Sequence, residues 1–235
     1  MRDGEVKSPE FDRYAPSYAE LLDDPMRKRF ARDPLHFHRR KWVMLQALLR
    51  RTGADAGSMR WLDVGCGQGE LLSLAGSAFA SAAGCDPSEG MLGADAPFAR
   101  LVQPSPVVLP FANGSMDLVT AVCVYHHVHG EARRLLTEEV RRVLAPGGLC
   151  CVIEHNPWNP VTRAIVKRCP VDVDAELLTA GESARMLAGS GLRPVSTDYF
   201  LYLPESLFAR LGWLESVFAR VPLGGQYAVL GKKHA

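Results

Sequence analysis

The chain has 235 residues, 47% of them hydrophobic and 23% charged, which is the balance of an ordinary globular protein with a buried core. Its formal net charge of +1 supplies no strong positive field, so we expect no nucleic-acid partner. No apolar run approaches the roughly 18 residues of a membrane-spanning helix, and residues 1–16 lack the apolar centre of a signal peptide. The six cysteines form no CxxC pair, which favours reduced, buried thiols and a cytoplasmic location.

In chain order, apolar residues at helical spacing first predict helices over 17–33 and 34–51, with Pro34 suited to a helix start. From residue 59, short apolar runs alternate with helix-like segments, and such continuous apolarity indicates strands that are buried on both faces. The predicted strands are 59–64, 82–86, 100–103, 117–124, 149–154, 194–203 and 226–231.

A helix over 131–144 ends at Ala-Pro-Gly-Gly, which is a strong stop signal. Thr179 and Glu182 have the spacing of a capping box that opens another helix. An apolar helical segment, 204–221, separates the last two strands. This order of elements predicts one α/β domain over 1–235. We expect a Rossmann-like, doubly wound, mostly parallel seven-stranded sheet with helices on both faces and an N-terminal helical cover over 1–55.

Three glycines, Gly65, Gly67 and Gly69, stand at alternate positions after the first predicted strand, with Asp63 in front of them. Glycines in a strand–turn–helix unit let a ligand approach the backbone closely, and the helix start offers unpaired N–H groups. Asp86, at the end of the second predicted strand, follows Gly69 by 17 residues and is placed to bind ribose hydroxyls. The loop therefore predicts a nucleotide site.

The spacing of the loop argues against a dinucleotide. A dinucleotide fingerprint would need its third glycine at position 70, which is Glu70. The carboxylates of Asp63 and Glu70 would also repel a pyrophosphate. S-adenosylmethionine (SAM) carries an ammonium and a sulfonium and no phosphate, so these acids favour SAM over a nicotinamide cofactor.

Four segments, taken in order, resemble the motifs of class I SAM-dependent methyltransferases of the small-molecule type. They are LDVGCGQG (62–69), GCDPSEGML (84–92), LPFANGSMDLVTAVCVYHHV (109–128) and EEVRRVLAPGGLCCVIE (138–154). The resemblance covers about residues 59–154. It implies SAM as the cofactor and S-adenosylhomocysteine as the product.

The resemblance also implies a set of cofactor-binding residues. They are Tyr18, Asp63, Gly65, Cys66, Gly67, Asp86, Pro87, Met91, Ser105 and Cys123. In this scheme Asp63 lines the methionine end of SAM, Asp86 binds the ribose, and Met91 packs near the adenine. Ser105 stands where relatives often carry an aspartate that contacts the adenine amino group, and its hydroxyl is a weaker, uncharged partner. Tyr18, together with Tyr14, belongs to the cover that we expect near the cofactor.

Titratable side chains follow the fourth and fifth predicted strands, at the carboxyl edge where open α/β sheets bind ligands. We expect His126 or His127 to act as a base toward the methyl acceptor, with Glu154 or His155 as an orienter or an alternative base. The alternative is that the histidine pair caps the strand and binds backbone. A metal site built from His126, His129 and His155 matches no standard ligand spacing, so we predict no metal.

The segment 156–181 is too long for a tight connection, and we predict that it forms part of the acceptor pocket or a lid. It contains Trp158, Asn159, Arg163 and Arg168. The basic stretch 26–41 predicts a solvated helix face, with contact to an acidic acceptor as the alternative. The apolar segment 207–221 is compatible with a lipid-linked acceptor, although packing on the sheet explains it equally well.

The predicted function is methyl transfer from SAM to an oxygen or nitrogen of a small-molecule acceptor, such as a natural product or a sugar- or lipid-linked metabolite. Two alternatives stay open: a SAM-binding protein without turnover, and a nicotinamide-dependent Rossmann oxidoreductase. No Asn-Pro-Pro-Tyr-type motif follows the fourth predicted strand, which argues against methylation of nucleic acid.

Overall fold

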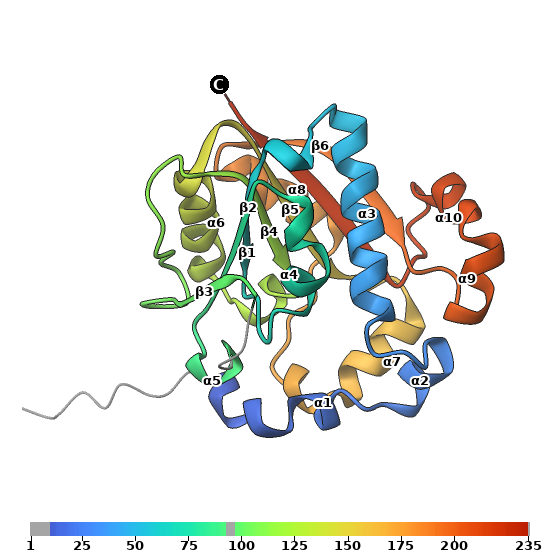
Figure 1. Cartoon of the computed structure of the whole chain (residues 1–235). Helices are drawn as coiled ribbons and strands as arrows, with labels where there is room; N and C mark the ends of the chain where they lie inside the picture. The colour runs from blue at the N-terminus through green and yellow to red at the C-terminus, as the bar shows by residue number, and fades with distance from the viewer. Residues whose placement is uncertain (1–9, 93–96, 235) are drawn as a thin grey trace, which may run out of the picture.

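The computed structural model describes residues 10–92 and 97–234, and one seven-stranded sheet runs through them (Figure 1). The strands are β1 (Arg60–Val64), β2 (Ser81–Asp86), β3 (Ala99–Val102), β4 (Met116–Val122), β5 (Leu144–His155), β6 (Leu192–Phe200) and β7 (Gln226–Lys233). Their order across the sheet is β3-β2-β1-β4-β5-β7-β6. Neighbours from β3 to β5 are parallel, whereas β7 is antiparallel to both β5 and β6. The predicted Rossmann-like, mostly parallel sheet is therefore confirmed.

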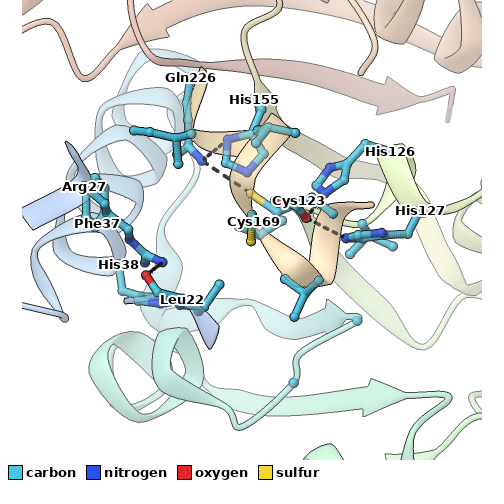
Figure 2. Close-up of a pocket in the computed structure, with 18 of the residues that line it drawn as sticks. Leu22, Arg27, Phe37, His38, Cys123, His126, His127, His155, Cys169 and Gln226 are labelled. Atoms are coloured by element: carbon cyan, nitrogen blue, oxygen red, sulfur yellow. Dashed lines mark hydrogen bonds and ion pairs between the residues drawn. The ribbon is translucent and has the colours of Figure 1, made fainter. Parts of the chain in front are cut away.

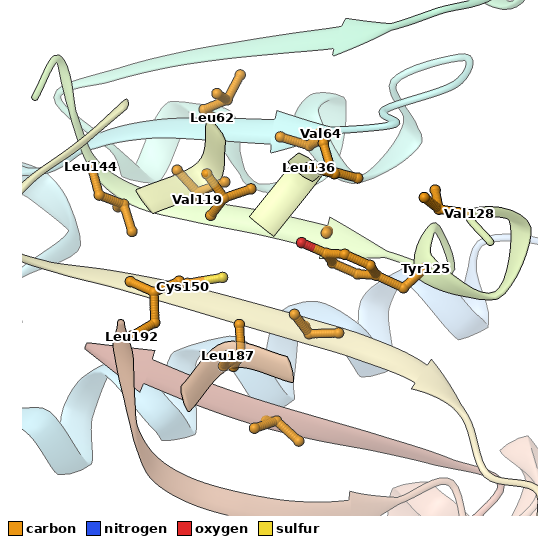
Figure 3. Close-up of a cluster of buried hydrophobic side chains, with 14 of the residues drawn as sticks. Leu62, Val64, Val119, Tyr125, Val128, Leu136, Leu144, Cys150, Leu187 and Leu192 are labelled. Atoms are coloured by element: carbon orange, nitrogen blue, oxygen red, sulfur yellow. The ribbon is translucent and has the colours of Figure 1, made fainter. Parts of the chain in front are cut away.

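Helices cover both faces of this sheet, as predicted (Figure 1). They are α1 (Tyr18–Leu21), α2 (Pro25–Phe30), α3 (His36–Thr52), α4 (Glu70–Ala75), α5 (Glu89–Leu92), α6 (Glu131–Val143), α7 (Pro160–Arg168), α8 (Ala180–Gly189), α9 (Glu205–Leu211) and α10 (Trp213–Phe218). On one face, Leu45 of α3 and Leu72 of α4 belong to a buried apolar cluster with Trp61. On the other face, Leu136 of α6 and Leu187 of α8 belong to a second cluster (Figure 3).

Successive side chains of β1 pack in the two different clusters. Leu62 and Val64 of β1 pack in the cluster with α6 and α8, while Trp61 packs in the cluster with α3 and α4 (Figure 3). Burial on both faces explains the nearly continuous apolar runs of the strands. Because β1 lies between β2 and β4, the winding of the sheet reverses there. Ligands of open α/β sheets bind beyond the carboxyl ends of strands at such a reversal.

The N-terminal segment differs from the prediction. The expected helix over 17–33 is broken into α1 and α2, with a turn between them. Asp24 caps α2, because its carboxylate accepts the backbone N–H groups of Met26 at 2.7 Å and Arg27 at 3.0 Å. Pro25 follows as the first helical residue. An aspartate followed by proline starts a new helix and cannot continue an old one, so the prediction of one continuous helix was wrong.

The segment between β6 and β7 also differs. It forms two short helices, α9 and α10, that meet at Gly212. Trp213 and Val217 are 64% and 65% exposed, so the apolar side of this segment does not pack on the sheet. The segment is held by Glu215, which is buried and forms an ion pair with buried Arg40 of α3. One buried charge pair thus replaces the apolar packing that the sequence suggested.

The capping box at the start of α8 is confirmed: the backbone N–H of Glu182 donates to the Thr179 hydroxyl at 3.2 Å, and the backbone N–H of Thr179 donates to the Glu182 carboxylate at 2.7 Å. Within 10–92 and 97–234, no helix has both the length and the apolarity to cross a membrane.

Candidate active site

A cavity of about 1000 Å³ lies beyond the carboxyl ends of β1, β2 and β4. Residues of α2, α3 and α7 also line it, and Figure 1 shows α1, α2 and α7 at the same end of the molecule. Ligand pockets in proteins measure roughly 300–1,000 Å³, so this volume suits a cofactor together with a small second ligand.

The glycine loop forms one wall of this cavity. Gly65 and Gly67 have φ angles of 66° and 52°, in the left-handed region where residues with a Cβ are strained. A Cβ on Gly65 would also lie 2.5 Å from a methyl group of Val124. The backbone N–H groups of Gly65 and Cys66 both donate to the carbonyl of Cys85, at 2.7 and 3.1 Å. The loop therefore folds tightly between β1 and β2 and presents bare backbone to the cavity.

Asp86 stands at the end of β2, and the loop itself orients its side chain. Its two carboxylate oxygens accept the backbone N–H groups of Gly67 at 3.0 Å and Ser88 at 2.9 Å. Burial raises the pKa of Asp86, while these two N–H donors oppose the shift. The carboxylate lines the cavity, in position to accept hydrogen bonds from a pair of hydroxyl groups.

Asp63 is a buried acid that forms no ion pair within the part of the chain that the structure describes. Its partner across the sheet is Thr120, whose hydroxyl donates to the Asp63 carboxylate at 2.5 Å. Burial raises the pKa of Asp63 to about 7, although the hydroxyl of Thr120 and the charge of Lys41 favour the ionised form. Asp63 lines the cavity, so an ammonium group there would supply the missing counter-charge. This pair of acceptor carboxylates fits SAM, whose ammonium group and two ribose hydroxyls are hydrogen-bond donors.

Most of the predicted cofactor residues meet at this cavity. Those that line it are Tyr18, Asp63, Gly65, Cys66, Gly67, Asp86, Pro87, Met91 and Cys123. Ser105 and Tyr14 do not line it. Buried Gln103, directly after β3, lines the cavity in place of Ser105, and its side-chain amide donates to the Ser105 carbonyl at 3.4 Å. Gln103 was detectable in the sequence as the first polar residue after the apolar part of the third strand.

Cys123 follows β4 with a φ angle of 58°, which is unusual for a residue other than glycine. The side-chain amide of Gln226 donates to its sulfur at 3.3 Å (Figure 2). Burial raises the pKa of this thiol, but Lys41 and His155 outweigh burial and lower it to about 7. A strained backbone and a stabilised thiolate thus occur together at the centre of the cavity.

A cluster of histidines and carboxylates forms the other end of the cavity. His126 Nδ1 lies 2.5 Å from the Glu154 carboxylate, which also accepts the backbone N–H of Tyr125 at 2.7 Å. Asp172 approaches from the 156–181 segment, and its Oδ1 lies 3.6 Å from His126 Nε2 and 3.4 Å from His127 Nε2. Burial opposes protonation of His126, but the two carboxylates prevail and raise its pKa.

The two histidines do not point to opposite sides, as residues of an extended strand end would. They lie in a 3₁₀ turn, Tyr125–His127, and their ring centroids are 4.1 Å apart. Figure 2 shows the two rings close together at one side of the cavity. His155 lines the cavity separately, with its Nδ1 3.5 Å from the Gln226 amide nitrogen. Exposed His129 pairs with Glu176 at 3.3 Å and does not line the cavity.

The 156–181 segment contributes different residues from those that the sequence indicated. Asn159 and Arg168 line the cavity, whereas Trp158 and Arg163 do not. Asp172 was missed, because one aspartate in a polar segment carries no local signal of the histidines it will meet. The segment also contains α7, whose last residue, Arg168, pairs with Asp24 at 3.0 Å and so joins α7 to the start of α2.

The basic stretch 26–41 is only partly solvated. Lys28 forms an exposed ion pair with Asp23, as expected of a solvated face. Arg27, Arg29 and Lys41 line the cavity instead. Arg27 packs over the ring of Phe37 at 4.7 Å and donates to the carbonyl of Leu22 at 3.4 Å (Figure 2). Three cationic side chains of this stretch therefore lie at the cavity, and contact with an acidic acceptor stays a prediction.

The fold and the site together define a Rossmann-like protein with a nucleotide-type cofactor site at the winding reversal of its sheet. Residues 62–152 match the family described as "Methyltransferase domain". An uncharacterized methyltransferase of Mycolicibacterium gilvum (strain PYR-GCK) is 36% identical over 112 residues, which is 46% of this chain and 43% of the relative. The chain spans less than half the length of the curated relatives that it matches.

Solved structures share the fold. A SAM-dependent methyltransferase from Mesorhizobium loti has a TM-score of 0.59 at 23% identity and covers 82% of this chain and 97% of its own. The [4+2]-cyclase SpnF has a TM-score of 0.61 at 16% identity and covers 97% of both chains. The prediction is confirmed at the level of the domain: residues 62–152 match the methyltransferase domain family, and solved SAM-dependent methyltransferases share the fold of the chain.

Proposed function

We propose that this chain transfers the methyl group of SAM to an oxygen or nitrogen of a small-molecule acceptor that binds at the histidine end of the cavity. One observation carries the proposal. The acids suited to the ammonium and ribose of SAM, Asp63 and Asp86, line the same cavity as His126, His127 and Asp172. Cofactor and acceptor can therefore meet inside one cavity of about 1000 Å³.

When bound, SAM supplies a methyl group on a positively charged sulfur, which leaves as S-adenosylhomocysteine when the acceptor attacks. The protein then has to orient two ligands and hold the acceptor proton. Asp63 binds the ammonium, Asp86 the ribose and Gln103 the adenine edge. Cys123 borders the methionine part of the cofactor from its position after β4.

The histidine end serves the acceptor. Glu154 fixes the ring of His126 through Nδ1, so the Nε2 atom of that ring faces Asp172. His127 is 22% exposed and lines the cavity, which makes it the residue best placed to touch an acceptor hydroxyl or amine. His126, Glu154 and Asp172 then act as positioning residues. They fix the orientation of His127 and of the acceptor relative to each other.

The lining also narrows the class of acceptor. Arg27, Arg29, Lys41 and Arg168 place cationic groups around the cavity. They favour a small acceptor with an anionic group, such as a phosphorylated or otherwise acidic sugar. The Arg168–Asp24 ion pair joins two segments that line the cavity, α7 and the start of α2.

Two measurements test the proposal. Calorimetry of the full chain with S-adenosylhomocysteine should show micromolar binding, with NAD as the control ligand that does not bind. Methyl-labelled SAM should then label a member of a panel of hydroxylated and amine acceptors, with acidic sugars included. His127→Ala should abolish most of that labelling, while His129→Ala, the exposed neighbour, should not. Failure to bind S-adenosylhomocysteine would overturn the proposal, and binding with no labelled acceptor would favour a SAM-binding protein without turnover.

A further inference from the structure

Three metal-ligating atoms converge at the histidine end of the cavity. His126, His127 and Asp172 each offer one metal-ligating atom, and these three atoms lie within 4.8 Å of one another. Asp172 Oδ1 is 3.6 Å from His126 Nε2 and 3.4 Å from His127 Nε2. Two ligand atoms at zinc-bond lengths of about 2.0–2.1 Å and a tetrahedral angle are separated by about 3.4 Å. Little movement is therefore needed for all three atoms to reach one ion.

The surroundings of His126 have the form that metal-binding histidines require. A ligating imidazole usually donates its second N–H to a carboxylate or carbonyl, which fixes the ring and makes it a better ligand. His126 Nδ1 is bonded in this way to Glu154 at 2.5 Å, and the backbone N–H of Tyr125 holds Glu154 in turn. Both side chains are buried, so this support is rigid. The Nε2 atom is left facing Asp172 and the cavity.

The ligand set is also open on one side. All three residues line the cavity, so an ion has an entry path and a free position that faces the proposed acceptor site. Catalytic zinc sites have this form: three protein ligands and one open position. Imidazole nitrogens with one carboxylate suit zinc and other divalent transition metals better than magnesium or calcium.

We propose that His126, His127 and Asp172 bind a divalent transition-metal ion, best matched by Zn²⁺, at the acceptor end of the cavity. The proposed site departs from our expectation of no metal, and its ligands differ from the His126, His129 and His155 set considered from the sequence. The role of the ion rests on the proposed function: a bound cation would coordinate the acceptor oxygen and make its proton more acidic, and His155, which also lines the cavity, would accept that proton. In that case His127 would be a ligand of the ion. The ion, and not His127, would activate the acceptor.

The first test uses chelator-treated full-length protein and Zn²⁺ alone, with calorimetry as the readout. We expect one ion per chain with a dissociation constant at or below micromolar. Asp172→Asn and His127→Ala should each weaken binding at least tenfold. His129→Ala removes a nearby exposed histidine outside the cavity and should leave binding unchanged. Circular dichroism of each variant checks that it is folded. Absent saturable binding, or binding that Asp172→Asn leaves intact, would overturn the site.

The second test uses Co²⁺ as a spectroscopic probe. A site of two imidazoles and a carboxylate should produce visible d–d absorption without an intense near-ultraviolet thiolate band. A strong thiolate band would mean that Cys169 or Cys123 holds the ion, and it would overturn the ligand set. Binding of S-adenosylhomocysteine to the metal-free protein is measured separately. If that binding persists while metal binding fails, only the metal site is wrong; if it is absent, the proposed function fails on its own.

Discussion

The backbone N–H of Gly67 donates to the Asp86 carboxylate at 3.0 Å and so joins the glycine loop after β1 to the acid at the end of β2. The bond depends on the backbone of Gly67, whose φ angle of 52° turns its N–H toward the neighbouring strand end. A second N–H, from Ser88, fixes the other carboxylate oxygen at 2.9 Å. Asp86 is therefore oriented before any ligand arrives.

Replacing Asp86 by alanine should weaken S-adenosylhomocysteine binding at least tenfold, which corresponds to about 1.4 kcal/mol. The variant loses two charge-assisted hydrogen bonds to the ribose, each worth about 1.5–3 kcal/mol. Calorimetry measures the change. Asp117 pairs with Arg60 at the ends of β1 and β4 that lie away from the cavity. The Asp117→Ala variant should therefore bind the ligand normally. Equal affinities for the two variants would mean that another residue holds the ribose.

The stability of the ligand-free protein should depend on pH through Asp63. Its folded-state pKa is raised from 3.8 to about 7 by burial, so its contribution to stability is complete below about pH 3.8 and is lost as the pH rises to about 7. Between pH 5 and pH 8 this loss amounts to about 2–3 kcal/mol, at 1.36 kcal/mol per pH unit. The Asp63→Asn variant has no proton to lose at this position. Its stability relative to the wild type should therefore be higher at pH 8 than at pH 5 by about that amount.

Urea unfolding of both proteins at pH 5 and pH 8 checks this prediction. The same variant should bind S-adenosylhomocysteine more weakly at pH 8, because an amide cannot neutralise the ligand's ammonium. A stability difference that stays constant across the two pH values would show that Asp63 is ionised throughout this range.

Cys123 should be the most reactive thiol in the chain. Its pKa is lowered to about 7, since Lys41 and His155 outweigh its burial, whereas burial raises the pKa of the other five cysteines. The thiolate is the form that reacts, so iodoacetamide at pH 7.5 should modify Cys123 first. Peptide mass spectrometry over time measures the order. S-adenosylhomocysteine should slow the reaction, and faster labelling of half-buried Cys169 would contradict the prediction.

Removing Glu215 should destabilise the fold. Its carboxylate pairs with buried Arg40 and accepts the backbone N–H groups of Leu201, Tyr202 and Leu203, each at 3.1 Å. Glu215→Ala leaves the buried guanidinium of Arg40 without its ion-pair partner, so the free energy of unfolding should fall by about 3–5 kcal/mol. Urea denaturation followed by circular dichroism measures the loss. Glu138→Ala breaks an exposed pair with Arg134 and should change stability by less than about 1 kcal/mol, and a similar loss in both variants would refute the anchoring role.

The sequence by itself determined the sheet and predicted most of the residues that line the proposed cofactor end of the cavity. Every predicted strand matches an observed one, because strands covered by helices on both faces are continuously apolar and need no distant information to be recognised. Asp63, Gly67 and Asp86 were likewise visible, since a tight turn between two adjacent strands places its chemistry within a short stretch of chain. The capping box at Thr179 is local in the same sense.

The tertiary structure alone decided which side chains meet at the acceptor end. Asp172 reaches His126 and His127 from a segment more than forty residues further along the chain, and no local pattern marks that encounter. The 3₁₀ turn at Tyr125–His127 brings two adjacent histidines to one side, where an extended strand would have separated them. Glu215 replaced apolar packing by a buried ion pair with Arg40. Contacts of this kind depend on how the elements pack in three dimensions. Hydrophobic periodicity and turn chemistry, in contrast, depend only on residues that are neighbours in the sequence.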